Sequence, residues 1–162
     1  MNEAILGNEG IEQFLTFELA KEAYGVEILK VQEIRGWEPV REIPNMPSFI
    51  KGALNLRGTI VPIIDLRERF NMESCDYSPT TVVIVLSVQD ESGQHVLGIV
   101  ADSVSDVLDI SLEKIKEAPN FGSKIDTRYM RGMYVADEKM ILLLNVDRLL
   151  NSEEFNGLED LV

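Results

Sequence analysis

The stretch Phe49–Phe70, FIKGALNLRGTIVPIIDLRERF, returns in altered form 80 residues later as Tyr129–Leu150, YMRGMYVADEKMILLLNVDRLL. The two stretches align without a gap, with Gly52 opposite Gly132 and mostly apolar residues opposite apolar ones. In each stretch, two apolar runs flank a short polar tip, which is typical of a β-hairpin. The tips differ in charge, because Arg57-Gly58 of the first becomes Asp137-Glu138 in the second.

A second pair of similar segments lies upstream of these hairpins. YGVEILKVQEI at 24–34 matches LGIVADSVSDV at 97–107 at an offset of 73, so that Gly25 stands opposite Gly98. Most of the chain alternates polar and apolar residues or forms short runs rich in Val and Ile, which predicts strands. Two units with the same order of pieces indicate an all-β fold, either a small barrel or a sandwich.

The pattern also predicts the remaining local structure. We expect hairpins from 14–19 with 24–28 and from 80–88 with 96–100, and short helices at 65–70, 111–117 and 145–150. One domain over residues 11–154 would contain a first unit at about 11–78 and a second at 79–150, with exchange of strands between the units allowed. Residues 1–10 and 155–162 are expected to be flexible ends.

Composition limits the classes of function. The chain has 162 residues and a net charge of −13, which disfavours nucleic-acid binding and adsorption to anionic membranes. The single cysteine, Cys75, excludes an internal disulfide. No signal peptide is apparent, and the longest apolar runs are too short to cross a bilayer, so we expect a cytoplasmic protein with no inserted segment.

Candidates for catalysis are few. His95 is the only histidine and is expected to be a solvated residue beside a hairpin tip. Glu27 and Asp102 are the acids in an apolar strand context, and we expect both to face solvent at a sheet edge. Two converging carboxylates would still allow a hydrolase, which stays open as an alternative. The phosphate-binding glycine motifs are absent, and no metal or other cofactor is indicated.

The first polar tip is the stronger candidate for a binding site. Arg57 either is a plain turn residue or presents its guanidinium to a partner. The two repeats keep the residues of the hairpin walls and reverse the charge of the tip, which favours two different partners for two similar units. Glu33, near the end of a predicted strand, is the nearest charged candidate beside it.

Several motifs, in this order, resemble the CheW family of bacterial chemotaxis coupling proteins. They are YGVEILKVQEIRG, FIKGALNLRGTIVPIIDLR, TTVVIVLSV, GIVADSVSDVL and LLNSEE, and the resemblance covers residues 13–154. It implies two five-stranded SH3-like β-barrels that share a hydrophobic seam, and a protein without catalytic activity. A regulatory domain of the CheA or CheV type is the nearest alternative.

The resemblance also implies partners and site residues. The family joins the cytoplasmic tips of methyl-accepting chemoreceptors to the CheA histidine kinase, in arrays at the inner face of the membrane, and we expect the free chain to be a monomer. The expected receptor-binding residues are Val31, Glu33, Ile34, Gly52, Asn55, Arg57 and Gly58. The expected kinase-binding residues are Val100, Asp102, Val104, Val107, Gly132, Met133 and Tyr134.

Overall fold

The computed structural model describes residues 10–72, 76–117, 126–151 and 154. Cys75 and the two ends expected to be flexible lie outside these ranges, except for Gly10. The strands are β1 Ile11–Leu19, β2 Glu22–Glu27, β3 Val31–Gly36, β4 Ile50–Leu56, β5 Thr59–Asp65, β6 Val82–Asp90, β7 Gly93–Ala101, β8 Ser103–Ser111, β9 Met130–Ala136 and β10 Lys139–Leu144. The short helices are η1 Ile28–Lys30, α2 Leu66–Arg69, η2 Leu112–Lys114, η3 Thr127–Tyr129 and η4 Val146–Arg148.

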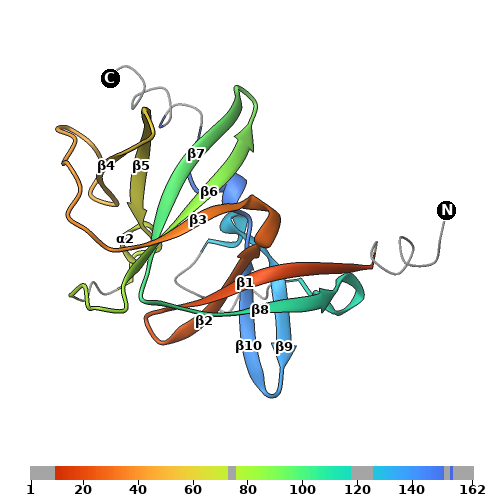
Figure 1. The fold of residues 1–162 in the computed structure, drawn as a ribbon. Coiled ribbons are helices and arrows are strands. Elements are labelled where there is room, and N and C mark those ends of the chain that lie inside the picture. Colours follow the sequence, from red (N-terminus) through yellow and green to blue (C-terminus); the bar gives the residue numbers. More distant parts are fainter. Residues whose placement is uncertain (1–9, 73–75, 118–125, 152–153, 155–162) are drawn as a thin grey trace.

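The ten strands form two five-stranded sheets, in the orders β3-β6-β7-β5-β4 and β8-β1-β2-β10-β9. Figure 1 shows the first above the second. Each sheet curls on itself: Arg41, in the connection after β3, bridges to Ala53 on β4, the opposite edge, and Lys116, just after η2, bridges to Met133 on β9. The expected all-β fold of two small five-stranded barrels is confirmed.

The two barrels do not divide the chain at residue 78. One barrel is built from β3 to β7 alone, a continuous run of the chain, and we call it the inserted barrel. The other, the split barrel, takes β1 and β2 from before that run and β8 to β10 from after it. Strands are therefore exchanged between the halves, because β1 pairs with β8 and β2 pairs in parallel with β10. The units of repetition at 11–78 and 79–150 are not the units of folding.

The two alignments read from the sequence describe equivalent places in the two barrels. Gly25 lies opposite Leu143 in the parallel pair β2–β10, and Gly98 lies opposite Ile63 in the parallel pair β7–β5. A Cβ on Gly25 would lie 2.9 Å from Leu143 Cδ2, and one on Gly98 would lie 2.7 Å from Ile63 Cδ1. Glycine is thus needed in both barrels because a neighbouring strand sends a large side chain over its Cα.

Most of the buried apolar surface lies between the barrels. Twenty buried side chains, contributed by both sheets, form one cluster. Examples are Phe17 of β1 and Tyr24 of β2 from the split barrel, and Ile84 of β6 and Leu97 of β7 from the inserted barrel. The barrel interiors hold only six and five buried residues. Because each buried apolar side chain contributes about 1.5–3 kcal/mol, the shared seam dominates the stability of both barrels.

Local predictions were accurate for turns and less so for helices. All four hairpins form, and Asp65 begins α2 by accepting a hydrogen bond from the Arg67 amide. The expected helix at 111–117 is only the single turn η2, and the one at 145–150 is only η4. Both segments stop after one turn, although Val146, Leu149 and Leu150 of the second are buried in the shared seam.

Candidate docking surfaces

The tip of the β4–β5 hairpin presents Arg57 to solvent. Arg57 and Gly58 have φ of 50° and 89°, the left-handed conformation that a two-residue hairpin turn requires. The Gly58 amide donates to Asn55 Oδ1 over 2.9 Å, which fixes the turn. The Arg57 side chain is 81% exposed, and its Nη2 donates to Glu33 Oε1 over 3.1 Å. The guanidinium is therefore oriented by a carboxylate while most of its donors remain open.

The partner of Arg57 lies on β3, an edge strand of the inserted barrel that pairs only with β6. Glu33 leans toward the tip, whereas Ile34 points outward and is 44% exposed. Val31 is half-buried and packs against the seam between the barrels. The sequence-predicted receptor residues Val31, Glu33, Ile34 and Arg57 thus lie on or beside one edge of this barrel, with Asn55 and Gly58 shaping the turn.

Gly52 belongs to the framework. It is buried, and a Cβ there would lie 2.2 Å from the Arg41 carbonyl oxygen. The Ala53 amide donates to that same oxygen over 2.8 Å, so the connection after β3 closes onto β4 at this point. The predicted receptor contact Gly52 thus lies in the buried framework, where the absence of a Cβ allows the barrel to close.

The β9–β10 hairpin has the same backbone and the opposite charge. Asp137 and Glu138 have φ of 48° and 67°, so their turn matches that of Arg57 and Gly58. Asp106 on β8 stands at the position that corresponds to Glu33. In the inserted barrel these two positions hold the ion pair Arg57–Glu33. In the split barrel the equivalent residues, Asp137 and Asp106, are both carboxylates.

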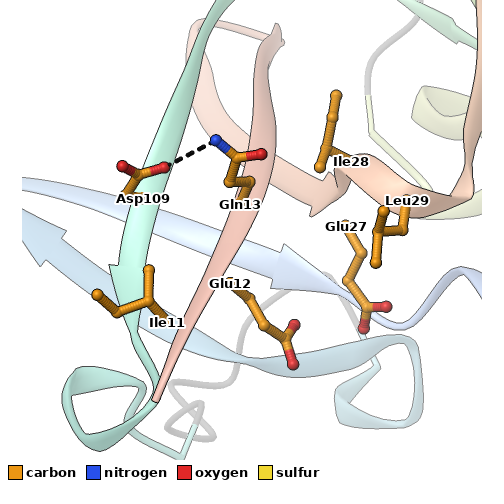
Figure 2. Close-up of a pocket in the computed structure, with 7 residues that line it drawn as sticks. All are labelled: Ile11, Glu12, Gln13, Glu27, Ile28, Leu29 and Asp109. Carbon is orange, nitrogen blue, oxygen red and sulfur yellow. Dashed lines mark hydrogen bonds between the residues drawn. The ribbon is translucent and has the colours of Figure 1, made fainter. Parts of the chain in front are cut away.

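An open groove lies beside the turn η1 and encloses about 710 Å³ (Figure 2). Leu29 at its rim is 95% exposed, and Ile11 on β1 is 47% exposed. Leu29 and Ile11 together place exposed apolar surface beside one hollow, which makes this groove a candidate protein interface. The lining residues are Ile11, Glu12, Gln13, Glu27, Ile28, Leu29 and Asp109.

Two carboxylates converge at this groove, as Figure 2 shows. Arg131 Nη1 lies 2.6 Å from Glu12 Oε2 and 2.6 Å from Glu27 Oε1, and Nη2 donates to Glu12 Oε1 over 3.1 Å. The hydrogen bond from Arg131 lowers the pKa of Glu12. A hydrolase needs one acid whose pKa is raised, so this pair does not support the carboxylate mechanism. Glu27 was expected to face solvent and instead holds Arg131.

The expected kinase-binding residues fall into three groups. Val100 and Gly132 are buried; Val100 packs in the interior of the inserted barrel, so neither presents a side chain to a partner. Asp102 is engaged by Arg67 at 3.2 Å and by the Ala20 amide at 2.8 Å. Val107 is 46% exposed on β8, and Val104, Met133 and Tyr134 are half-buried on β8 and β9.

His95 differs from its expected state as a solvated residue. Its side chain is only 10% exposed, and Nε2 lies 2.9 Å from Asp90 Oδ1 and 3.0 Å from Ser92 Oγ. These contacts brace the β6–β7 turn. Among the described residues, no cluster of three or more His, Cys, Asp or Glu side chains could hold a metal ion. No helix in the described ranges is long and apolar enough to cross a membrane.

Sequence reasoning missed the groove and the cation beside it. Leu29 was not among the predicted site residues, and the crossing of the chain from β2 to β3 leaves it outside both barrels. Arg131 aligns with Lys51 in the repeat, and this shared positive charge was the signal in the sequence that pointed to a basic residue at this position.

Comparison with known proteins gives one consistent result. The model of the CheW-like domain matches residues 13–154. Chemotaxis protein CheW of Klebsiella aerogenes is 50% identical over 143 residues, which cover 88% of this chain and 84% of that protein. CheW of Rhizobium meliloti is 32% identical over 145 residues, 90% of this chain and 91% of that protein.

The structural comparison agrees with the sequence comparison. The crystal structure of the scaffolding protein TtCheW from Thermoanaerobacter tengcongensis matches with a TM-score of 0.78 at 31% identity, over 88% of this chain and 90% of that chain. The resemblance carried by the sequence motifs is confirmed. The chain belongs to the CheW family, whose members are chemotaxis scaffold proteins and not enzymes.

Proposed function

We propose that this protein couples methyl-accepting chemoreceptors to the histidine kinase CheA and thereby joins the signalling arrays at the inner face of the membrane. The observation that carries the proposal is the state of Arg57, which is 81% exposed yet held by Glu33. An exposed and oriented guanidinium is suited to charge-assisted hydrogen bonds with a carboxylate or with carbonyl oxygens.

The receptor is proposed to bind at the edge of the inserted barrel. A helical receptor tip would lay apolar side chains against Ile34 and the exposed part of Val31, while an acidic or carbonyl group meets Arg57. Asn55 and Gly58 hold the turn that aims Arg57. An arginine contact of this kind contributes on the order of 2 kcal/mol, which corresponds to more than a tenfold change in affinity.

Binding to a receptor cytoplasmic fragment tests this assignment. Arg57→Ala and Arg57→Asp should weaken binding by tenfold or more, with the larger loss for Asp because it also repels Glu33. Asp137→Ala at the equivalent turn is the matched control and should change receptor affinity less than twofold. Circular dichroism verifies the fold of each variant, and wild-type affinity in a folded Arg57→Ala protein contradicts the proposal.

The kinase is proposed to bind on the split barrel and at its border with the inserted barrel. The candidates from the sequence with accessible side chains are the exposed Val107 and the half-buried Val104, Met133 and Tyr134. The groove at Leu29 and Ile11 extends this face along β1 and β8. Leu29→Glu should reduce affinity for the CheA regulatory domain more than tenfold, because it places a charge in an apolar contact. Ile60→Glu, at an apolar residue that is 39% exposed on β5, is the control and should have little effect.

A further inference from the structure

Two connections join the barrels, and an aspartate holds each of them in the same way. The first runs from β2 through η1 to β3, and the second runs from β7 to β8 through Asp102. At each connection one aspartate accepts a hydrogen bond from a backbone amide of a neighbouring hairpin and forms an ion pair with a basic side chain. The two arrangements are similar: each pairs a residue of the connection with one of the aligned positions Arg67 and Asp147, and they differ in which partner carries the positive charge.

At the β7–β8 connection the cation comes from the short helix. Asp102 Oδ2 accepts the Ala20 amide over 2.8 Å, and Oδ1 lies 3.2 Å from Arg67 Nη1. Arg67 is only 1% exposed and also donates to Asp65 over 3.1 and 3.2 Å. Tyr77 adds its hydroxyl to Asp65 over 3.1 Å. This connection is fixed within a buried polar network.

At the β2–β3 connection the cation lies on the connection itself. Asp147 of η4 accepts the Gln89 amide over 2.9 Å, and its two carboxylate oxygens lie 2.8 and 2.7 Å from Lys30 Nζ. Asp147 stands at the position of Arg67 in the repeat. The Lys30 and Asp147 side chains are 25% and 32% exposed, so this ion pair is accessible to water and salt.

The position of Lys30 gives the exposed pair its significance. Lys30 lies between Leu29, at the rim of the groove, and Val31, which begins the strand that carries Glu33 and Ile34. The two proposed docking surfaces are therefore joined by one short turn, which is held by the packing of Ile28 against the seam and by the Lys30–Asp147 pair.

From this geometry we infer that Lys30 and Asp147 position η1 and set how strongly binding at the groove is transmitted to the Arg57 surface. The functional part of this inference rests on the proposed function. Two surfaces are coupled when binding at one changes the free energy of binding at the other, and a rigid connection that both surfaces share is a physical route for that coupling.

Hydrogen exchange tests the positioning without any partner. Lys30→Met keeps an unbranched apolar stem and removes the charge, so it should speed exchange of the amides in β3 while the β6–β7 amides stay protected. Lys51→Met is the matched control, because Lys51 of β4 forms an ion pair of similar exposure, with Glu68 of α2. Equal β3 exchange in wild type and Lys30→Met overturns the inference, whether or not the proposed partners bind.

Binding linkage tests the transmission. The affinity for the CheA regulatory domain is measured with and without saturating receptor fragment, and the ratio of the two affinities is the coupling factor. Lys30→Met and Asp147→Asn should move this factor toward 1 by about threefold or more. Lys30→Arg, which keeps the charge opposite Asp147, should leave the factor near the wild-type value, and Lys51→Met should leave it unchanged.

The outcomes separate the two proposals. Unchanged coupling in Lys30→Met, with both partners bound, overturns the role of Lys30 in transmission and leaves the proposed function intact. Failure of wild-type protein to bind either partner contradicts the proposed function, and the hydrogen-exchange result then decides the positioning role alone.

Discussion

The β4–β5 and β9–β10 hairpins have the same backbone and opposite chemistry. Both turn through two residues with positive φ, and both close a barrel against a connection that bridges to the next strand. One presents Arg57 beside Glu33, whereas the other presents Asp137 and Glu138 on the same barrel as Asp106. The two barrels therefore share the backbone of this hairpin and differ in the charge that its tip presents. Variants at equivalent positions can test how far this equivalence extends.

The largest difference is expected between Arg67 and its equivalent, Asp147. Arg67→Met leaves Asp65 buried without its cation and should cost about 3–5 kcal/mol of unfolding free energy. Asp147→Asn keeps an acceptor for the Gln89 amide and loses a partly exposed ion pair, so it should cost less than about 1 kcal/mol. Urea unfolding of both variants measures the difference, and equal losses would contradict the unequal burial of the two sites.

The paired glycines Gly52 and Gly132 should show the next largest difference. A Cβ on Gly52 would lie 2.2 Å from a backbone oxygen, and its φ is 156°. On Gly132 the nearest atoms, Ile115 Cγ2 and the Lys116 oxygen, lie at 2.7 Å. Gly52→Ala should therefore cost about 3 kcal/mol and Gly132→Ala about 1–2 kcal/mol, as measured by thermal unfolding. A larger loss for Gly132→Ala than for Gly52→Ala would show that the split barrel closes more tightly than the inserted barrel.

At the tips of the two hairpins, a substitution in the split barrel should raise stability, and the change should be smaller than at the glycines of the walls. Glu138 has φ of 67° where its counterpart is Gly58, and a side chain with a Cβ is disfavoured in that conformation. Glu138→Gly should stabilise the protein by about 0.5–1 kcal/mol, and Gly58→Glu should destabilise it by a similar amount. Denaturant midpoints at fixed slope give both values. No gain from Glu138→Gly would indicate that the glutamate has a compensating contact.

The smallest change in stability is expected at the β6–β7 turn. Asp90, Ser92 and His95 form a hydrogen-bonded cluster there, whereas the equivalent β1–β2 turn has Ala20 and Lys21. Hydrogen bonds from Ser92, with a contribution from His95, lower the pKa of Asp90 to about 2. A lowered carboxyl pKa stabilises the folded state above the ordinary aspartate pKa, and this contribution disappears as the pH falls from about 4 toward 2. Asp90→Asn should therefore lower the melting temperature slightly at pH 7 and not at pH 2. A constant difference across this range would rule out the ionised carboxylate as the cause.

The sequence identified the strands because the information for them is local. Alternation marked the strands, and tips such as Arg57-Gly58 marked the hairpins, since turn chemistry depends on neighbouring residues. The alignment of Gly25 with Gly98 also located equivalent points of the two barrels. The assignment of Arg57 and Glu33 to one surface followed from the family resemblance and from the charge reversal between the tips.

What could not be predicted depends on contacts between distant segments. The parallel pairing of β2 with β10 has no connecting turn, so no local pattern signals it. Arg67 lies in a polar segment that predicts an exposed helix face, yet it is buried because Asp65, Asp102 and Tyr77 surround it. Leu29 shows the converse, since it is apolar and yet lies exposed where the chain crosses between the barrels.

The insertion of one barrel inside the other imposes an order on synthesis. Every strand of the inserted barrel has left the ribosome once residue 101 has emerged, whereas β1 and β2 lack their partner β10 until residue 144 has emerged. At about 5–20 residues per second, the 43 residues from 101 to 144 take roughly 2–9 seconds to synthesise. Phe14 of β1, which is fully buried in one cluster with Ile141 and Leu143 of β10, must wait for that strand with its side chain uncovered. The oldest end of the nascent chain therefore keeps apolar surface exposed until synthesis is almost complete, a condition that favours aggregation.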